Sequence, residues 1–147
     1  MSLGELVTEE GALMAIARDM KTIAVVGIKD DKDPFAPAYT IPAMLKQAGV
    51  RVIGVNPRVP EALGEKTLAS VAELPAAVDV LDVFRRPDAI PELTDQLLAL
   101  PAEKRPAVVW MQSEIRHDPS AARLVAAGYR VVQDHCLGVY SKRAGRR

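Results

Sequence analysis

The sequence predicts an α/β protein with three layers, in which helices cover both faces of a parallel sheet of about five strands. Short apolar runs rich in β-branched residues alternate along the chain with longer stretches whose apolar residues recur at helical spacing. The 147 residues are 49% hydrophobic and 26% charged, which is typical of one ordinary globular domain. We therefore expect residues 1–147 to form a single domain with its own core.

The chain is expected to begin with a helix within residues 1–20. Leu13 and Ala17 stand at helical spacing in this stretch. Ser2, followed three residues later by Glu5, forms a possible capping box at the start of the helix. The other end of the chain, 139–147, is a basic tail that we expect to be solvated.

Strands and helices should alternate between these two ends. The expected strands are 22–27, 50–55, 78–84, 107–111 and 129–133. Thr40 can cap a helix that stops at Gly49, and the capping box of Ser70 and Glu73 can begin a short helix. The apolar stripe from Ile90 to Leu100 indicates a further helix, and the last expected helix begins at Asp118 and stops at Gly128. With right-handed crossovers, this alternation favours a Rossmann-like sheet, for which we predict the strand order 3-2-1-4-5.

Charge and cysteine content exclude several classes of function. The 19 basic and 19 acidic residues give a formal net charge of zero, so the whole chain exerts no long-range attraction on nucleic acid. Cys136 is the only cysteine, which excludes an intrachain disulfide and multi-cysteine metal sites. No apolar run reaches the ~18 residues of a membrane-spanning helix, and no signal-peptide pattern opens the chain. We expect a cytoplasmic protein without a metal, nucleic-acid or membrane partner.

Ligands of open parallel sheets bind beyond the carboxyl ends of the strands, at the point where the strand order reverses. The segments at these positions are Gly27-Ile28-Lys29, Asn56-Pro57-Arg58, Phe84-Arg85-Arg86 and Met111-Gln112-Ser113. Three of the four carry a cation, and Arg and Lys side chains suit a small molecule with several phosphates.

The phosphate-binding loop after the first strand departs from the dinucleotide fingerprint, because only Gly27 of the G-x-G-x-x-G pattern is present. Arg58 follows the second strand, where an NAD-binding protein would present a carboxylate to the ribose hydroxyls. A cation at this position favours a ligand whose ribose is phosphorylated. NADP and coenzyme A both meet this requirement.

Five motifs carry a resemblance when they are taken in order and with their spacing. They are Ala24-Val25-Val26-Gly27, Val55-Asn56-Pro57-Arg58, Leu63-Gly64-Glu65-Lys66, the run from Asp79 to Phe84 with Arg85-Arg86, and Val108-Val109-Trp110-Met111-Gln112. This combination resembles the stand-alone CoA-binding protein family, which is similar to the CoA-binding domain of succinyl-CoA ligase α subunits and ADP-forming acyl-CoA synthetases. The resemblance runs from about residue 20 to about residue 138.

The resemblance implies a Rossmann-like domain that holds coenzyme A across the strand ends. By this resemblance, the pyrophosphate would be approached by Gly27, Ile28 and Lys29, and the adenosine phosphate end by Asn56, Pro57 and Arg58. The floor of the site would be formed by Phe84 and Arg85, next to Arg86. The pantetheine would lie toward Met111 and Gln112. Tyr39 and Thr40 would introduce a helix whose backbone N–H groups point at an anion.

Catalytic residues are not evident in the sequence. The ligases use a second domain with a phosphorylatable histidine, for which this sequence has no counterpart. Of the two histidines, His117 is expected at the surface, and His135 beside Cys136 is poorly placed for a thiolate pair because successive side chains of an extended segment face opposite ways. We predict a coenzyme A or acyl-CoA binding module without catalysis of its own. An NADP-dependent oxidoreductase-like domain and a CoA-responsive regulatory or interaction protein are the alternatives.

Overall fold

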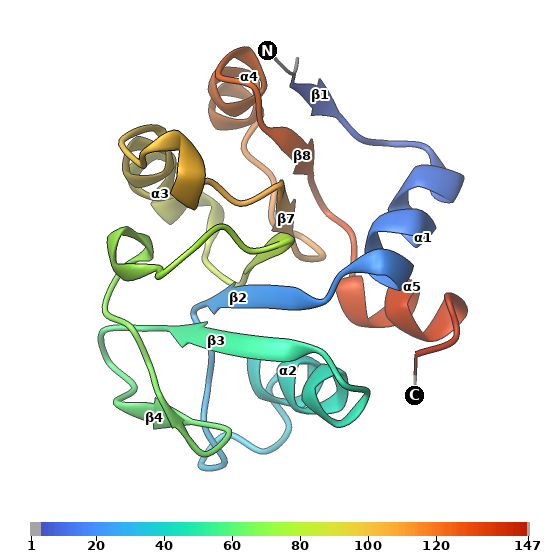
Figure 1. Cartoon of the computed structure of the whole chain (residues 1–147), viewed down its shortest axis with the longest axis vertical. Helices are drawn as coiled ribbons and strands as arrows, with labels where there is room; N and C mark the ends of the chain where they lie inside the picture. The colour runs from blue at the N-terminus through green and yellow to red at the C-terminus, as the bar shows by residue number, and fades with distance from the viewer. Residues whose placement is uncertain (1–3, 147) are drawn as a thin grey trace.

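The apolar runs of the sequence form the central sheet of the computed structural model, which describes residues 4–146 (Figure 1). The strands are β1 (Glu5–Leu6), β2 (Thr22–Val26), β3 (Arg51–Val55), β6 (Val80–Val83), β7 (Val108–Met111) and β8 (Arg130–Val132). Each neighbouring pair in this sheet is parallel. Five of the six strands lie inside the predicted runs, and the short strand β1 was not predicted.

The strands are arranged in the order β1-β8-β7-β6-β2-β3. Numbered as the five predicted strands, this order is 2-1-3-4-5, so the prediction 3-2-1-4-5 was wrong. The third run, β6, is buried throughout and pairs with both β2 and β7. The outer edge of β3 is instead covered by Leu68, whose N–H donates to Gly54 O and whose carbonyl accepts from Asn56 N, both at 2.8 Å. The point where the strand order reverses therefore lies between β2 and β6.

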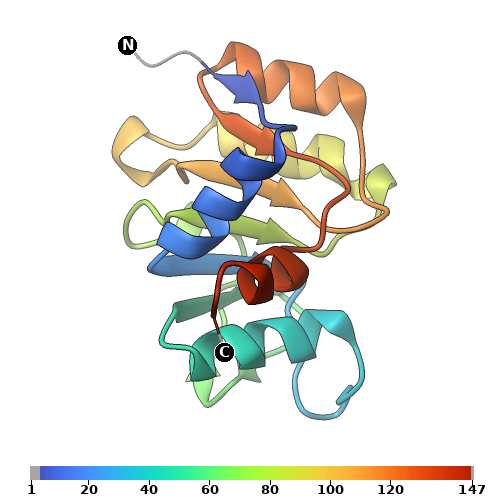
Figure 2. The same ribbon diagram turned by 90° about the vertical axis from the view of Figure 1, so that its right-hand side faces the viewer.

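Two layers of helices cover the sheet. On one face lie α1 (Glu10–Asp19), α2 (Pro37–Gln47) and α5 (Leu137–Arg143), which are turned toward the viewer in Figure 2. On the other face lie α3 (Ile90–Leu98) and α4 (Asp118–Ala126) together with the short 3-10 helix η1 (Val71–Glu73). Two further 3-10 turns, η2 (Pro87–Ala89) and η3 (Ala102–Lys104), precede α3 and β7.

Alternation along the strands divides the core into two clusters. Val25 and Trp110 face α1, α2 and α5, whereas Leu81 and Val109 face α3 and α4. Trp110 is fully buried, and its indole N–H donates to the carbonyl of His135 at 2.8 Å. The hydrogen bond of the indole N–H thus joins β7 to the segment that precedes α5.

Both expected helix starts near the first strand were wrong. The first helix occupies Glu10–Asp19 rather than residues 1–20. Ser2 of the expected capping box lies outside the described residues, and Glu5 pairs with Arg130 in the sheet. The second helix begins at Pro37, because proline at the first helical position already has a helical φ. Thr40 consequently lies within the first turns of α2 instead of capping it.

The expected solvated tail is largely structured. Residues 139–143 belong to α5, and the Arg146 guanidinium donates to the carbonyls of Ala17, Arg18 and Met20 at the end of α1. These carbonyls have no partner within α1, so Arg146 satisfies them and places a positive charge at the negative end of the helix. The last residue, Arg147, is outside the described part of the chain.

A small hairpin lies beyond the edge strand β3. Its strands are β4 (Glu61–Ala62) and β5 (Glu65–Lys66), which pair antiparallel. Leu63 and Gly64 join them with φ values of 55° and 82°, as a two-residue hairpin turn with left-handed residues requires. Within residues 4–146, no helix combines the length and the apolarity needed to cross a membrane.

Candidate functional site

A cavity of about 670 Å³ lies where β2, β3 and β6 end. This position is the one that the observed strand order selects for a ligand, because the order reverses between β2 and β6. Eight of the predicted site residues line it, namely Gly27, Lys29, Asn56, Pro57, Arg58, Phe84, Arg85 and Arg86. Three predicted segments that are distant in sequence therefore meet around one cavity.

Gly27 allows two of these segments to approach each other. Its φ is 85°, a conformation that side chains disfavour, and a Cβ atom at this position would lie 2.3 Å from the carbonyl oxygen of Phe84. The Gly27 N–H donates to Val55 O at 2.8 Å, and the Phe84 N–H donates to Val26 O at 2.9 Å. The three strand ends are thus joined by backbone contacts that only glycine permits at this point.

Asn56 joins the loops that follow β2 and β3. Its side chain is 6% exposed; the Nδ2 amide donates to Ile28 O, and the Oδ1 oxygen accepts from Arg58 N, both at 2.9 Å. The second contact is an Asx turn, which shapes the loop after β3. Asn56 is therefore a positioning residue that holds the backbone of Arg58 beside the loop carrying Lys29.

Four cationic side chains line the cavity: Lys29, Arg58, Arg85 and Arg86. Two of them form long, exposed ion pairs, Lys29 with Asp33 at 3.9 Å and Arg86 with Asp88 at 3.6 Å. Such pairs contribute little to stability and can be exchanged for a ligand. Among residues 4–146, the guanidinium groups of Arg58 and Arg85 carry neither a hydrogen bond nor an ion pair.

The remaining predicted residues lie elsewhere. Tyr39 lines a separate cavity of about 370 Å³ that also contains Asp30, Asp31 and Glu61. Thr40 is exposed on α2, and the side chains of Ile28 and Met111 are each 1% exposed within the core. Gln112 is 4% exposed, and its amide donates to Asp82 Oδ1.

Asp82 is an unusual residue for the middle of a sheet. It is fully buried on the face covered by α1, α2 and α5, and its second oxygen, Oδ2, has no hydrogen-bond partner among the described residues. Burial raises the pKa of the Asp82 carboxyl to about 7, although the hydrogen bond from Gln112 opposes this shift. In the sequence, Asp82 stands within a predicted strand without an assigned role, because an isolated aspartate in an apolar run gives no signal for its partner.

One wall of the cavity was not predicted from the sequence. Glu92 and Gln96 line it from α3, and Ser70 lines it from the cap of η1. The spacing of Glu92 and Gln96 places them on one face of a helix, and this pattern could have indicated a shared surface. Ser70 Oγ accepts from Ala72 N at 3.2 Å, which confirms the cap that was predicted there.

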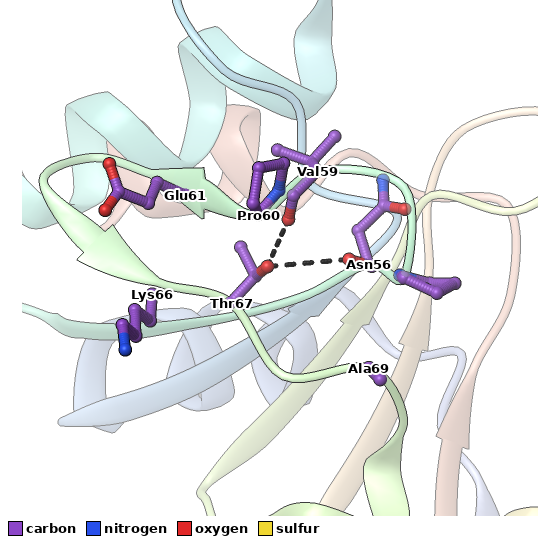
Figure 3. A pocket seen from close by; sticks show the side chains of 8 residues that line it. Asn56, Val59, Pro60, Glu61, Lys66, Thr67 and Ala69 are labelled. Atoms are coloured by element: carbon purple, nitrogen blue, oxygen red, sulfur yellow. Dashed lines mark hydrogen bonds between the residues drawn. The ribbon is translucent and has the colours of Figure 1, made fainter.

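A second groove of about 570 Å³ lies along the loop that follows β3 (Figure 3). It shares Asn56, Pro57, Val59 and Ala69 with the cationic cavity. Thr67 follows β5, and its hydroxyl contacts Val59 O and Asn56 O in the loop that follows β3. These contacts tie the hairpin to the rim of the cavity.

The histidines take part in the fold. His117, which was expected at the surface, is half-buried and caps α4, since its Nδ1 atom accepts from Ser120 N at 3.2 Å. His135 Nδ1 lies 2.7 Å from Gln133 O rather than against Cys136, which is half-buried at the start of α5. No cluster of three His, Cys, Asp or Glu side chains within residues 4–146 is placed to hold a metal ion.

Comparisons with known proteins identify the family of the chain. A family model described as a CoA binding domain matches residues 21–142. The uncharacterized protein YneT of Bacillus subtilis (strain 168) is 32% identical over 124 residues, which cover 84% of this chain and 87% of that protein. The family match confirms the resemblance that the motifs indicated.

Solved structures of similar proteins share the fold. A Thermus thermophilus protein, described as cell-free ID.343, superposes with a TM-score of 0.83 at 42% identity and covers 93% of this chain and 99% of its own. A hypothetical protein from Pyrococcus horikoshii OT3 also reaches a TM-score of 0.83 at 26% identity, covering 98% of this chain and 99% of its own. These similarities confirm the predicted Rossmann-like class.

Proposed function

The chain belongs to the CoA-binding domain family, and we propose that it binds coenzyme A, free or acylated, in the cationic cavity at the ends of β2, β3 and β6. The observation that carries the proposal is the convergence of Lys29, Arg58, Arg85 and Arg86 on one cavity at the switch point of the sheet. Coenzyme A carries a pyrophosphate and a ribose phosphate, so one site must meet several negative charges at once.

The geometry supports a direction for the ligand. Gly27 and Lys29 adjoin the point where the backbones of β2 and β6 come closest, a place that suits a pyrophosphate. Arg58 follows β3, where related sheets contact the ribose, and its guanidinium can meet the 3′-phosphate as a planar fork. Phe84 and Arg85 would form the floor between these two ends.

We propose that the protein acts by binding alone. Both histidines are engaged in the fold, His117 as a helix cap and His135 through Gln133 O, which supports a structural role for each. The single cysteine and the absence of long basic or apolar segments in the sequence support a cytoplasmic location without nucleic-acid or membrane partners.

NADP is the second candidate ligand, because Arg58 could also bind a ribose 2′-phosphate. Isothermal titration calorimetry with coenzyme A, dephospho-CoA, NADP and NAD separates the candidates. We expect coenzyme A to bind most tightly and NAD not to bind, because no carboxylate follows β3. Equal affinities for NAD and coenzyme A would contradict the proposal.

A variant of Arg58 tests the role of the ribose phosphate. We expect Arg58→Ala to weaken coenzyme A by ~1.5–3 kcal/mol, the usual contribution of a charge-assisted hydrogen bond, and to change dephospho-CoA little. Arg123→Ala is the matched control, since Arg123 pairs with Asp95 on the surface of α3 and α4. Equal losses for the two ligands would show that Arg58 does not contact the ribose phosphate.

A further inference from the structure

The cationic cavity and the residues expected to contact the pantetheine lie in different parts of the molecule. All four cations line the cavity at β2, β3 and β6, whereas Met111 ends β7 and Gln112 follows it, one strand farther along the sheet. Neither Met111 nor Gln112 lines the cavity, and their side chains are 1% and 4% exposed. The side chains that suit phosphates therefore lie around the cavity, and the side chains expected to contact the neutral pantetheine do not.

Gln112 is committed to the fold. Its amide provides the one hydrogen bond that reaches the Asp82 carboxylate within residues 4–146, and Asp82 Oδ2 already lacks a partner. Turning Gln112 toward a ligand would leave a fully buried carboxyl group without any partner, which is strongly unfavourable. An amide that stabilises a buried acid is therefore a poor candidate for reading the pantetheine arm.

The cavity wall contributed by α3 suits the nucleoside part of a ligand. Glu92 is the only carboxylate among the described residues that line this otherwise cationic cavity, and Gln96 lies one turn farther along α3. A carboxylate repels phosphate but accepts hydrogen bonds from an amino group or a hydroxyl. Adenine and ribose carry these donors, so phosphate-binding and nucleoside-binding side chains share one cavity.

From these observations we infer that the site recognises the nucleotide half of coenzyme A, a 3′-phosphorylated adenosine with its 5′-phosphates, and does not read the thiol or its acyl group. The inference rests on the proposed function and narrows it. The protein would then bind free coenzyme A and its thioesters alike, and report on their total concentration rather than on the acylation state.

The test compares five ligands on the full chain by isothermal titration calorimetry: coenzyme A, acetyl-CoA, a long-chain acyl-CoA, 3′-phosphoadenosine 5′-diphosphate and 4′-phosphopantetheine. We expect dissociation constants for the two thioesters and for 3′-phosphoadenosine 5′-diphosphate within about tenfold of that for coenzyme A, and no measurable binding of 4′-phosphopantetheine. A difference of more than tenfold for 3′-phosphoadenosine 5′-diphosphate or either thioester, or binding of 4′-phosphopantetheine, would overturn the inference while leaving coenzyme A as the ligand. If coenzyme A itself does not bind, the proposed function fails as well.

Arg85→Ala gives a second measurement that does not depend on absolute affinity. Because Arg85 would contact only the nucleotide half, the variant should weaken the binding of coenzyme A and of 3′-phosphoadenosine 5′-diphosphate by the same factor, to within about threefold. Arg123→Ala should weaken neither. A loss confined to coenzyme A would place Arg85 against the pantetheine and overturn the inference.

Discussion

Arginines lie at both ends of the sheet, but they have different partners. At the amino end, Arg105 donates to the carbonyls of Leu98, Leu100 and Ala127 at 3.0–3.2 Å, and its guanidinium lies 5.4 Å from the ring centre of Tyr129. Arg146 closes the end of α1 in the same way. At the carboxyl end, the guanidinium groups of Arg58 and Arg85 line a cavity and have no acceptor among residues 4–146.

This difference shows how one residue type serves stability or binding according to the backbone around it. Helices run antiparallel to the strands, so their unpaired carbonyls gather at the amino end and provide acceptors for arginine. The carboxyl end offers no such carbonyls, and an arginine there remains available to an anion. The fold thus places structural arginines at one end and the arginines of the proposed ligand site at the other.

Two aspartates repeat the contrast at the two ends of β6. Asp79 lies at the amino end, where its Oδ2 oxygen accepts from Lys21 N at 2.7 Å and from Thr22 N at 3.1 Å. Asp82 lies near the carboxyl end with Gln112 as its only partner in the described part of the chain. The Asp82 carboxylate is therefore the less well satisfied of the two.

The largest effect is expected for the pH dependence of stability. The folded pKa of Asp82 is about 7 against an unfolded value of 3.8, so the folded protein binds the extra proton between these values. The free energy of unfolding should therefore fall by up to about 1.4 kcal/mol per pH unit as pH rises through this window, and level off above it.

Asp82→Asn should remove this contribution and make the protein more stable than the wild type at pH 8. Urea denaturation at a series of pH values measures it, and Asp79→Asn is the matched control that should keep the slope. An unchanged slope in Asp82→Asn would mean that Asp82 does not titrate in this range.

The next effect concerns the contact between β2 and β6. We expect Gly27→Ala to reduce the free energy of unfolding by about 3 kcal/mol and to abolish binding of coenzyme A, because it adds a backbone clash to an unfavourable φ. Gly49 also has a positive φ, of 95°, but open space around an added Cβ, so Gly49→Ala should lose only about 1 kcal/mol and bind normally. Equal losses in the two variants would show that the approach to Phe84 contributes nothing.

Alanine variants of one arginine from each end of the sheet should separate stability from binding. Arg105→Ala should lower the free energy of unfolding by about 1–2 kcal/mol, since three carbonyls lose a charged donor, and leave coenzyme A affinity unchanged. Arg85→Ala should do the reverse, with weaker binding and a stability within about 0.5 kcal/mol of the wild type. Chemical denaturation measures the free energy of unfolding of both variants, and calorimetry measures their affinity for coenzyme A. A variant that loses both stability and affinity would contradict this division of roles.

The smallest effect is expected for an exposed ion pair outside both regions. Arg123 lies 2.8 Å from Asp95, and the two side chains are 49% and 68% exposed. Arg123→Ala should change stability by less than about 1 kcal/mol, and the difference should shrink further at high salt. A larger loss in thermal unfolding would mean that this pair links α3 and α4 more strongly than its exposure suggests.

Much of the candidate site could be predicted because it follows a positional rule. The rule that ligands bind after the carboxyl ends of strands selected Lys29, Arg58 and Arg85, whereas the strands that flank the site depend on where the strand order reverses. Met111 and Gln112 were selected by the same rule, yet their side chains turn into the core. Their direction depends on partners such as Asp82, which lies 30 residues from Gln112 in the sequence.

The sequence by itself determined the class of the fold, the five main strands, and the helix ends at Gly49 and Gly128, because these features depend on periodicity and turn chemistry over a few residues. The tertiary structure decided the strand order, the pairing of β1 with β8, and the contact of Arg146 with α1. Each of these joins segments that are far apart in the chain. The arrangement that forms is the one that buries the most apolar surface and satisfies the most backbone groups over the whole molecule. A pattern of a few neighbouring residues does not contain this information.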